Sequence, residues 1–139
     1  PVCLMHKQGV PLTMQDQPQY DDVVEDIRRY LLKRADTCLN AGISAENIII
    51  DPGFGFGKSL QNNLSLLKHI DEFCALPYPV LVGISRKSMF GMLLGRDVED
   101  RLVASTSAVV IAFQIGARFF RVLDVAETCD ALRLCEAVE

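Results

Sequence analysis

The stretch IIIDPGFGFGKS, residues 48–59, joins a short β-branched run to an acidic residue and a glycine-rich turn. Ile48–Ile50 has the composition of a buried strand, and Asp51–Gly53 closes it with turn-forming residues. Leu60–Phe73 follows with the apolar spacing of a helix. A strand, a turn and a helix in this order form the unit from which parallel sheets are built.

The same unit recurs along the whole chain. Polar and turn residues follow the first strand through Gln19, and Gly42 stands where the first helix should end. We expect strands at Val2–Met5, Ile48–Ile50, Val80–Val82 and Phe119–Leu123, and helices at Val23–Leu39, Leu60–Phe73, Met89–Leu94, Arg101–Ile115 and Val125–Val138. The strands are apolar without alternation, which is typical of a sheet that is buried on both faces.

These features predict an α/β fold of four parallel βα units spanning residues 1–139. Two architectures fit the pattern: an open doubly wound sheet, or half of a (β/α)8 TIM barrel, since a whole barrel takes ~250 residues. The periodicity alone does not separate them.

Composition excludes several classes of protein. The 139 residues are 50% hydrophobic and 23% charged, with a net charge of −4, which argues against disorder and against a surface that wraps nucleic acid. The longest apolar run, Ala108–Phe113, is far shorter than the ~20 residues of a membrane span. No secretory signal is visible, and the start at Pro1, inside an apolar run, is interpreted as a cut or mature end.

The five cysteines have no CxxC spacing. We expect reduced, mostly buried thiols in a cytosolic protein, without a disulfide framework or a zinc site. His6 and His69 lie far apart in the sequence, so a histidine-rich metal site is not expected either.

Unusual polar residues follow each expected strand. They are His6–Gln8, Asp51–Lys58, Ser85–Ser88, and Arg121 with Asp124. Because the carboxyl ends of parallel strands share one rim, these residues should converge on a common site.

The glycine-rich turn matches no standard phosphate loop. A Walker A motif ending at Lys58 would need glycine where Pro52 stands, and a dinucleotide motif beginning at Gly53 would need glycine where Lys58 stands. The turn either lets backbone approach a ligand closely or is simply a tight βα turn capped by Asp51.

Cations mark the other two rim segments. Arg86 and Lys87 lie at an expected helix start, where the helix dipole disfavours positive charge, so they indicate an anion or a polar heterocycle, or else a solvated turn with Ser88 as its cap. Arg121 lies within an apolar run. Its guanidinium either stacks on a flat ring or holds phosphate, or else it forms a buried ion pair with a carboxylate such as Asp124.

Four blocks of sequence, in order, resemble the dihydropteroate synthase family. They are Val2–Gly9, Ile50–Lys58, Val82–Ser88 and Phe120–Val125. The resemblance covers the C-terminal half of that family's barrel, strands five to eight with their helices. It implies the condensation of 6-hydroxymethyl-7,8-dihydropterin diphosphate with p-aminobenzoate in folate synthesis, the reaction that sulfonamides block.

The resemblance also implies roles for individual residues. Asp51 would accept hydrogen bonds from the pterin, Lys87 would contact the pterin near its ring oxygen and N5, and Arg121 would lie on the pterin face and help to bind pyrophosphate. The remaining substrate-binding residues would be Met5, Phe56, Gly83, Arg86 and Ser88, with Ser88 donating to the aminobenzoate carboxylate.

The family further implies Mg²⁺ whose protein ligand lies outside this chain, a homodimer and a cytoplasmic location, with no nucleic-acid or membrane partner. Leu123 occupies the position where the family usually has a histidine that meets pyrophosphate. The 139 residues alone are expected to be inactive. A pterin-dependent methyltransferase and a non-catalytic fragment are the alternative interpretations.

Overall fold

The computed structural model describes residues 1–9 and 18–138, so most of the turn region expected before Gln19 lies outside the described residues. Four strands are present in this part of the chain. They are β1 (Val2–Met5), β2 (Ile48–Asp51), β3 (Leu81–Val82) and β4 (Phe119–Phe120).

The strands lie side by side in sequence order and run parallel. In β1 and β2, Val2 faces Ile48 and Met5 faces Asp51. In β3 and β4, Leu81 faces Phe119. A single parallel bridge between Ile50 and Val80 joins the two pairs. The predicted order of parallel βα units is therefore confirmed.

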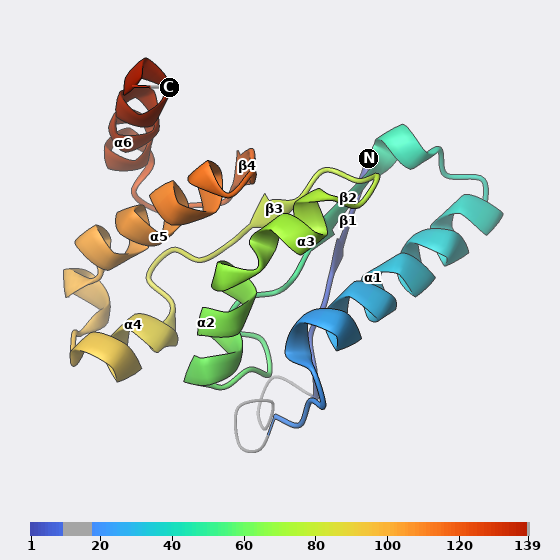
Figure 1. Cartoon of the computed structure of the whole chain (residues 1–139), viewed down its shortest axis with the longest axis horizontal. Helices are drawn as coiled ribbons and strands as arrows, with labels where there is room; N and C mark the ends of the chain where they lie inside the picture. The colour runs from blue at the N-terminus through green and yellow to red at the C-terminus, as the bar shows by residue number, and fades with distance from the viewer. Residues whose placement is uncertain (10–17, 139) are drawn as a thin grey trace.

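Within residues 1–9 and 18–138, six helices connect and cover these strands (Figure 1). They are α1 (Val23–Asn40), α2 (Leu60–Lys68), α3 (Ile70–Cys74), α4 (Ser88–Leu94), α5 (Leu102–Gln114) and α6 (Val125–Val138), with short 3₁₀ turns at Ala45–Asn47 and Val98–Asp100. Helices α1, α2, α3 and α5 lie on one side of the strands, and α6 packs against α5 at the C-terminal end of the chain.

Local signals explain the ends of α1. Asp22 caps its first turn, because the carboxylate accepts hydrogen bonds from the backbone N–H groups of Val24 and Glu25. At the other end Gly42 has φ +89°, the left-handed conformation that commonly follows a helix and that glycine adopts without strain.

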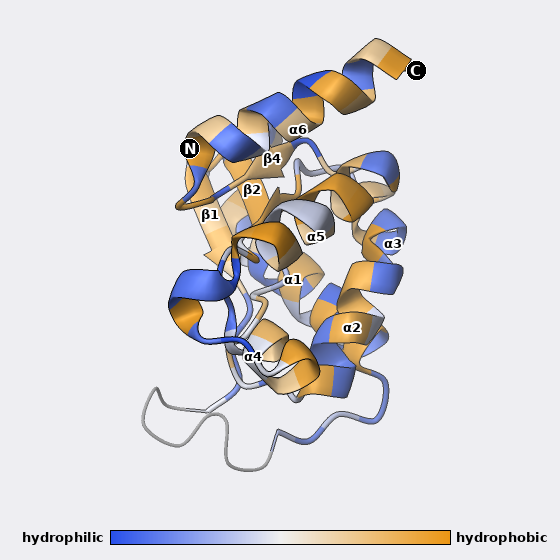
Figure 2. Cartoon of the chain, turned by 90° about the vertical axis from the view of Figure 1, so that its left-hand side faces the viewer, coloured by the Kyte–Doolittle hydropathy of each residue, from blue (hydrophilic) through white to orange (hydrophobic). Residues whose placement is uncertain are grey.

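The core lies between the strands and the inner faces of the helices. Ile27 and Leu31 of α1, Ile48 and Ile50 of β2, and Val82 of β3 are fully buried. Figure 2 shows hydrophobic segments on both the strands and the helices, with hydrophilic residues interspersed along α6. This burial anchors the strand ends that carry the polar residues.

Two expected elements differ from the structure. The predicted helix Leu60–Phe73 is two helices, because His69 has a non-helical backbone (φ −112°, ψ 30°). The predicted strand Phe119–Leu123 is only Phe119–Phe120, although the N–H of Arg121 still donates to the carbonyl of Val82 at 3.1 Å. Phe119–Phe120 pairs on one side with β3 in the described part of the chain.

The expectation that the cysteines are mostly buried is wrong. All five are free thiols, but only Cys135 is buried, whereas Cys38 and Cys74 are half-buried. Cys3 on β1 and Cys129 on α6 are exposed, because each lies on an outer element of the chain. Within residues 1–9 and 18–138, no helix combines the length and the apolar character needed to cross a bilayer.

Candidate functional site

Asp51 ends β2 with a carboxylate that has no exposed surface. Its Oδ1 accepts a hydrogen bond from the backbone N–H of Gly53 at 2.7 Å, and its Oδ2 accepts one from Arg121 Nη2 at 3.2 Å. Burial raises the pKa of Asp51, while the N–H of Gly53 and the charge of Arg121 act in the opposite direction. The interpretation of a tight turn capped by Asp51 is therefore confirmed, and the second carboxylate oxygen joins this turn to Arg121.

Arg121 follows β4 directly and reaches across β3 to the end of β2. Its guanidinium remains 56% exposed while it contacts the buried carboxylate. The guanidinium passes over Gly83, where an added Cβ would lie 2.6 Å from Nη2, so a side chain at that position would displace the arginine. The alternative partner predicted for Arg121, Asp124, is not the one observed.

Lys87 approaches the same place from the loop after β3. Its Nζ lies 4.1 Å from the centroid of the Phe56 ring, a cation–π contact across two neighbouring loops. Burial lowers the pKa of Lys87, Arg121 adds to this effect, and Asp51 opposes it. The structure thus brings Asp51, Lys87 and Arg121 to one rim, as the sequence predicted.

Three further predicted residues surround these groups. Met5 ends β1 directly opposite Asp51, and Phe56 lies under the Lys87 ammonium. Gly83 lies beneath Arg121. All three are therefore adjacent to the Asp51, Lys87 and Arg121 cluster.

Arg86, which the resemblance places in an aminobenzoate pocket, is paired with a carboxylate. Its Nε and Nη2 donate to the two carboxylate oxygens of Asp124 at 2.9 and 2.6 Å, and Nη1 donates to the carbonyls of Val98 and Glu99. Hydrogen bonding to Arg86 lowers the pKa of Asp124. The guanidinium is committed to holding two loops together, because a bidentate pair fixes both partners.

Ser88, the last residue of the Ser85–Ser88 segment, is exposed. Ser88 is the first residue of α4, and Lys87 occupies the N-cap position without a side-chain cap. The predicted alternative of a Ser88 cap is therefore not observed. Among the described residues, no hydrogen bond joins Ser88 to the Asp51 cluster.

Sequence reasoning missed two residues that shape the glycine-rich turn. Lys58 is buried, and its Nζ donates to the carbonyls of Gly53 and Phe56. Asn63 is buried as well, and its Oδ1 accepts from the N–H of Gly55 at 2.8 Å. The only signal was the position of Lys58 immediately after the glycines, which the failed Walker A comparison set aside.

A cavity of about 230 Å³ lies at the rim. It is lined by Gly83, Ser85, Lys87, Arg121, Val122 and Leu123. Two cations, a hydroxyl and a buried carboxylate nearby can bind a polar ring together with an anion.

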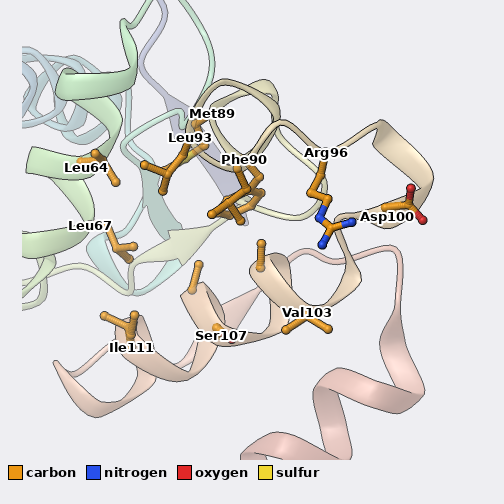
Figure 3. A pocket seen from close by; sticks show the side chains of 13 residues that line it. Leu64, Leu67, Met89, Phe90, Leu93, Arg96, Asp100, Val103, Ser107 and Ile111 are labelled. Atoms are coloured by element: carbon orange, nitrogen blue, oxygen red, sulfur yellow. The ribbon is translucent and has the colours of Figure 1, made fainter.

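A larger hollow of about 610 Å³ lies elsewhere, between α2, α4 and α5. Figure 3 shows Leu64, Leu67, Leu93 and Ile111 around it, with Arg96 toward one end. It is mostly apolar and does not share residues with the rim cavity, so it is better suited to a contact between helices than to the chemistry of the site.

The rim does not fit a magnesium site. In the part of the chain that the structure describes, no group of three or more His, Cys, Asp or Glu side chains could hold a metal ion. The carboxylate of Asp51 is already paired with a guanidinium.

Fold and site together define a parallel α/β unit with a polar cavity at the carboxyl ends of its strands. The family model described as "Pterin binding enzyme" matches residues 1–123, and the chain belongs to this family.

Individual relatives are similar over nearly the whole chain. It is 52% identical over 137 residues to the dihydropteroate synthase of Haemophilus influenzae, covering 99% of this chain and 50% of the relative. A Yersinia pestis dihydropteroate synthase in complex with a sulfonamide drug superposes with a TM-score of 0.96 at 46% identity, and one from Xanthomonas albilineans in complex with 7,8-dihydropteroate with 0.91 at 45%. Each alignment covers 99% of this chain and 50% of the other.

The chain therefore spans about half the length of the relatives it matches. Because the solved relatives are dihydropteroate synthases, which are TIM barrels, their likeness decides between the two predicted architectures. The four βα units form half of a (β/α)8 barrel, and the doubly wound alternative is excluded.

Proposed function

We propose that this chain forms the C-terminal half of a dihydropteroate synthase barrel. The enzyme would join 6-hydroxymethyl-7,8-dihydropterin diphosphate to p-aminobenzoate and release pyrophosphate. One observation carries the proposal: Asp51, Lys87 and Arg121 converge at the strand ends in a chain that is 52% identical to such an enzyme.

Asp51 would bind the pterin through its amino-pyrimidine edge. That edge presents adjacent N–H donors, and a buried carboxylate held by Gly53 and Arg121 offers fixed acceptors. Because Arg121 is 56% exposed, its guanidinium face would remain available to lie on the flat ring and to reach the diphosphate.

Lys87 would supply positive charge near the ring oxygen and N5. The Phe56 ring restrains its ammonium at 4.1 Å, which orients the charge before substrate arrives. Two cations at this rim would stabilise the negative charge of the departing pyrophosphate, and no nucleophilic side chain is needed if pyrophosphate leaves before the amine attacks.

We assign fewer residues to direct contact with aminobenzoate than the resemblance implied. Phe56 would form its wall, and Ser88, exposed at the start of α4, would donate to the carboxylate of the aminobenzoate. Arg86 would act through its pair with Asp124 and hold the loop that carries Lys87 and Ser88. We place the ligands for any Mg²⁺ outside the described residues.

A chimera tests the proposed function. These 139 residues would replace the matching half of the Haemophilus influenzae relative, and the product would be assayed for dihydropteroate formation from the two substrates. We expect activity, sensitivity to a sulfonamide, and a loss of about 100-fold or more in kcat/KM with Asp51→Asn.

A folded chimera that binds neither the pterin diphosphate nor a sulfonamide would contradict the proposal. Formation of a methylated product from a pterin methyl donor would instead favour the methyltransferase alternative. A Lys68→Met chimera is the matched control, because Lys68 is exposed on α2 away from the rim.

We further propose a cytoplasmic homodimer. The free cysteines fit a reducing compartment. Leu93 and Leu94 of α4 and Val103 and Ile111 of α5 are exposed apolar side chains that line the larger hollow, and a second copy would cover them. Val103→Glu in the chimera should weaken the dimer in sedimentation measurements, and an unchanged mass would contradict this interface.

A further inference from the structure

Lys58 is a buried charged residue to which the proposed reaction assigns no role. Its side chain is 1% exposed. Its Nζ lies 2.8 Å from the carbonyl oxygen of Gly53, 3.0 Å from that of Phe56 and 3.1 Å from His6 Nδ1. An ammonium group has three hydrogens and accepts none, so these three contacts use its entire capacity.

Two of these acceptors belong to the turn that carries groups of the site. The N–H of Gly53 donates to Asp51 Oδ1, and the N–H of Phe56 donates to the carbonyl of Gly53. Lys58 therefore binds the carbonyls at both ends of the Gly53–Phe56 turn. At one end of this turn the N–H of Gly53 holds the Asp51 carboxylate, and at the other end the Phe56 ring contacts Lys87.

The third acceptor ties this turn to the end of β1. The N–H of His6 donates to the carbonyl of Asp51 at 3.0 Å, and its ring packs edge-on against Tyr30. Tyr20 donates from its hydroxyl to the carbonyl of Gly57 at 2.8 Å. Gly53 has φ +74°, and a Cβ there would overlap the carbonyl of His6, so turn and strand are in direct contact.

The location of the ammonium is electrostatically costly. Burial lowers the pKa of Lys58 to about 7, with Lys87 acting in the same direction and Asp51 opposing. Burial and the charge of Lys58 lower the pKa of His6 to about 4, so His6 is neutral near pH 7 and its ring nitrogen is free to accept. An apolar side chain of similar length would avoid this cost but remove the donor to the Phe56 carbonyl and to His6 Nδ1, together with one of the two donors to the Gly53 carbonyl.

We propose, resting on the function proposed above, that Lys58 is a positioning residue for pterin binding. It closes the Gly53–Phe56 turn against the end of β1, and so sets the Asp51 carboxylate and the Phe56 ring in the orientation that receives the pterin. Lys58 acts through these two residues and does not touch the ligand.

The test compares Lys58→Met, which keeps the length and removes the donors, with Lys58→Arg, which keeps the charge and donors. Lys68→Met is the control. The complete gene product that carries this chain is used, well below the unfolding temperature of each variant. Hydrogen exchange is measured at the Gly53 and Phe56 amides, and kcat and KM for the pterin diphosphate are measured in parallel.

We expect Lys58→Met to speed exchange at both amides by about tenfold or more and to raise the KM for the pterin by a similar factor, with a smaller change in kcat. For Lys58→Arg, the exchange rates and the pterin KM should lie between those of Lys58→Met and those of the unsubstituted protein. For Lys68→Met, both quantities should equal those of the unsubstituted protein.

A pterin KM within twofold of the unsubstituted value in Lys58→Met, or unchanged exchange at both amides, would overturn the proposal. Failure of the unsubstituted protein to bind the pterin would instead count against the proposed function, and the exchange comparison would still decide whether Lys58 closes the turn.

Discussion

His6 is a buried histidine that should make stability depend on pH. Its pKa is about 4 in the folded chain, against 6.5 for an unperturbed histidine, because it is buried beside Lys58. Between these two pH values the unfolded chain binds a proton that the folded chain does not. The stabilisation is therefore complete above about pH 6.5 and is lost as the pH falls toward 4, by up to roughly 3 kcal/mol.

Urea unfolding at several pH values from 7.5 to 4.5 would measure this effect. His6→Asn keeps an acceptor near the position of Nδ1 and does not titrate, so its stability should fall less steeply with acid than that of the unsubstituted chain. His69→Asn, at a half-buried histidine between α2 and α3, is the control. Parallel pH curves for the unsubstituted chain and His6→Asn would contradict the assignment.

Leu123 is the rim residue where the chain departs from the pattern it resembles. Its side chain is 74% exposed and lines the cavity that Lys87 and Arg121 also line, while its N–H donates to Ser85 Oγ at 3.3 Å. An apolar side chain offers no hydrogen bond to an anion.

Leu123→His should therefore bind pyrophosphate more tightly, by roughly 2- to 10-fold, the equivalent of one added hydrogen bond. The gain should be larger at pH 6 than at pH 8, because the imidazole is charged at the lower pH. Calorimetry on the complete gene product would measure it, with Leu123→Met as the apolar control. Equal affinity in all three proteins would show that this position does not matter for pyrophosphate.

At the scale of elements, the loops after β3 and β4 are joined by Arg86 and Asp124. Arg86 is the one non-glycine residue with positive φ in residues 1–9 and 18–138, at 51°. Its N–H donates to Ser105 Oγ and its carbonyl accepts from Arg101, so the strained backbone is held from both sides. The pair thereby fixes the loop from which Lys87 extends.

A double-mutant cycle tests this link. Arg86→Gln and Asp124→Asn should each lower kcat/KM by roughly tenfold, because Lys87 loses its fixed position, and the double variant should be no worse than either single one. Losses that multiply in the double variant would show that the two residues act independently. Arg133→Gln on the exposed face of α6 is the control.

The same elements explain how far the sequence could predict the structure. Apolar runs and glycines placed the parallel βα units correctly, because burial and turn conformations are local consequences of residue type. The partners of the charged residues were not local. Arg121 reaches Asp51 across 70 positions, and Lys58 reaches His6 across 52. Spacing alone therefore offered Asp124 as one possible partner of Arg121, did not predict its pairing with Asp51, and left Lys58 without a role.

At the scale of the whole molecule, the two outer strands, β1 and β4, each form hydrogen bonds to a neighbouring strand along one edge. Within the described residues β1 pairs only with β2 and β4 only with β3, apart from the bridge that joins the pairs. Unpaired strand edges and exposed apolar surface promote association. The exposed apolar side chains near β4 and along α6 are Phe119, Leu123, Val125, Leu134 and Val138.

A polypeptide of these 139 residues alone should therefore self-associate and form no dihydropteroate. Light scattering should give a mass well above 15.4 kDa that rises with concentration. If the β4 and α6 side drives association, the double variant Leu134→Lys with Val138→Lys should lower the mass. If the α4 and α5 face drives association, the double variant Val103→Lys with Ile111→Lys should lower it instead. A monomer at high concentration that makes dihydropteroate would contradict both parts, because it would show that four βα units close a working site without further strands.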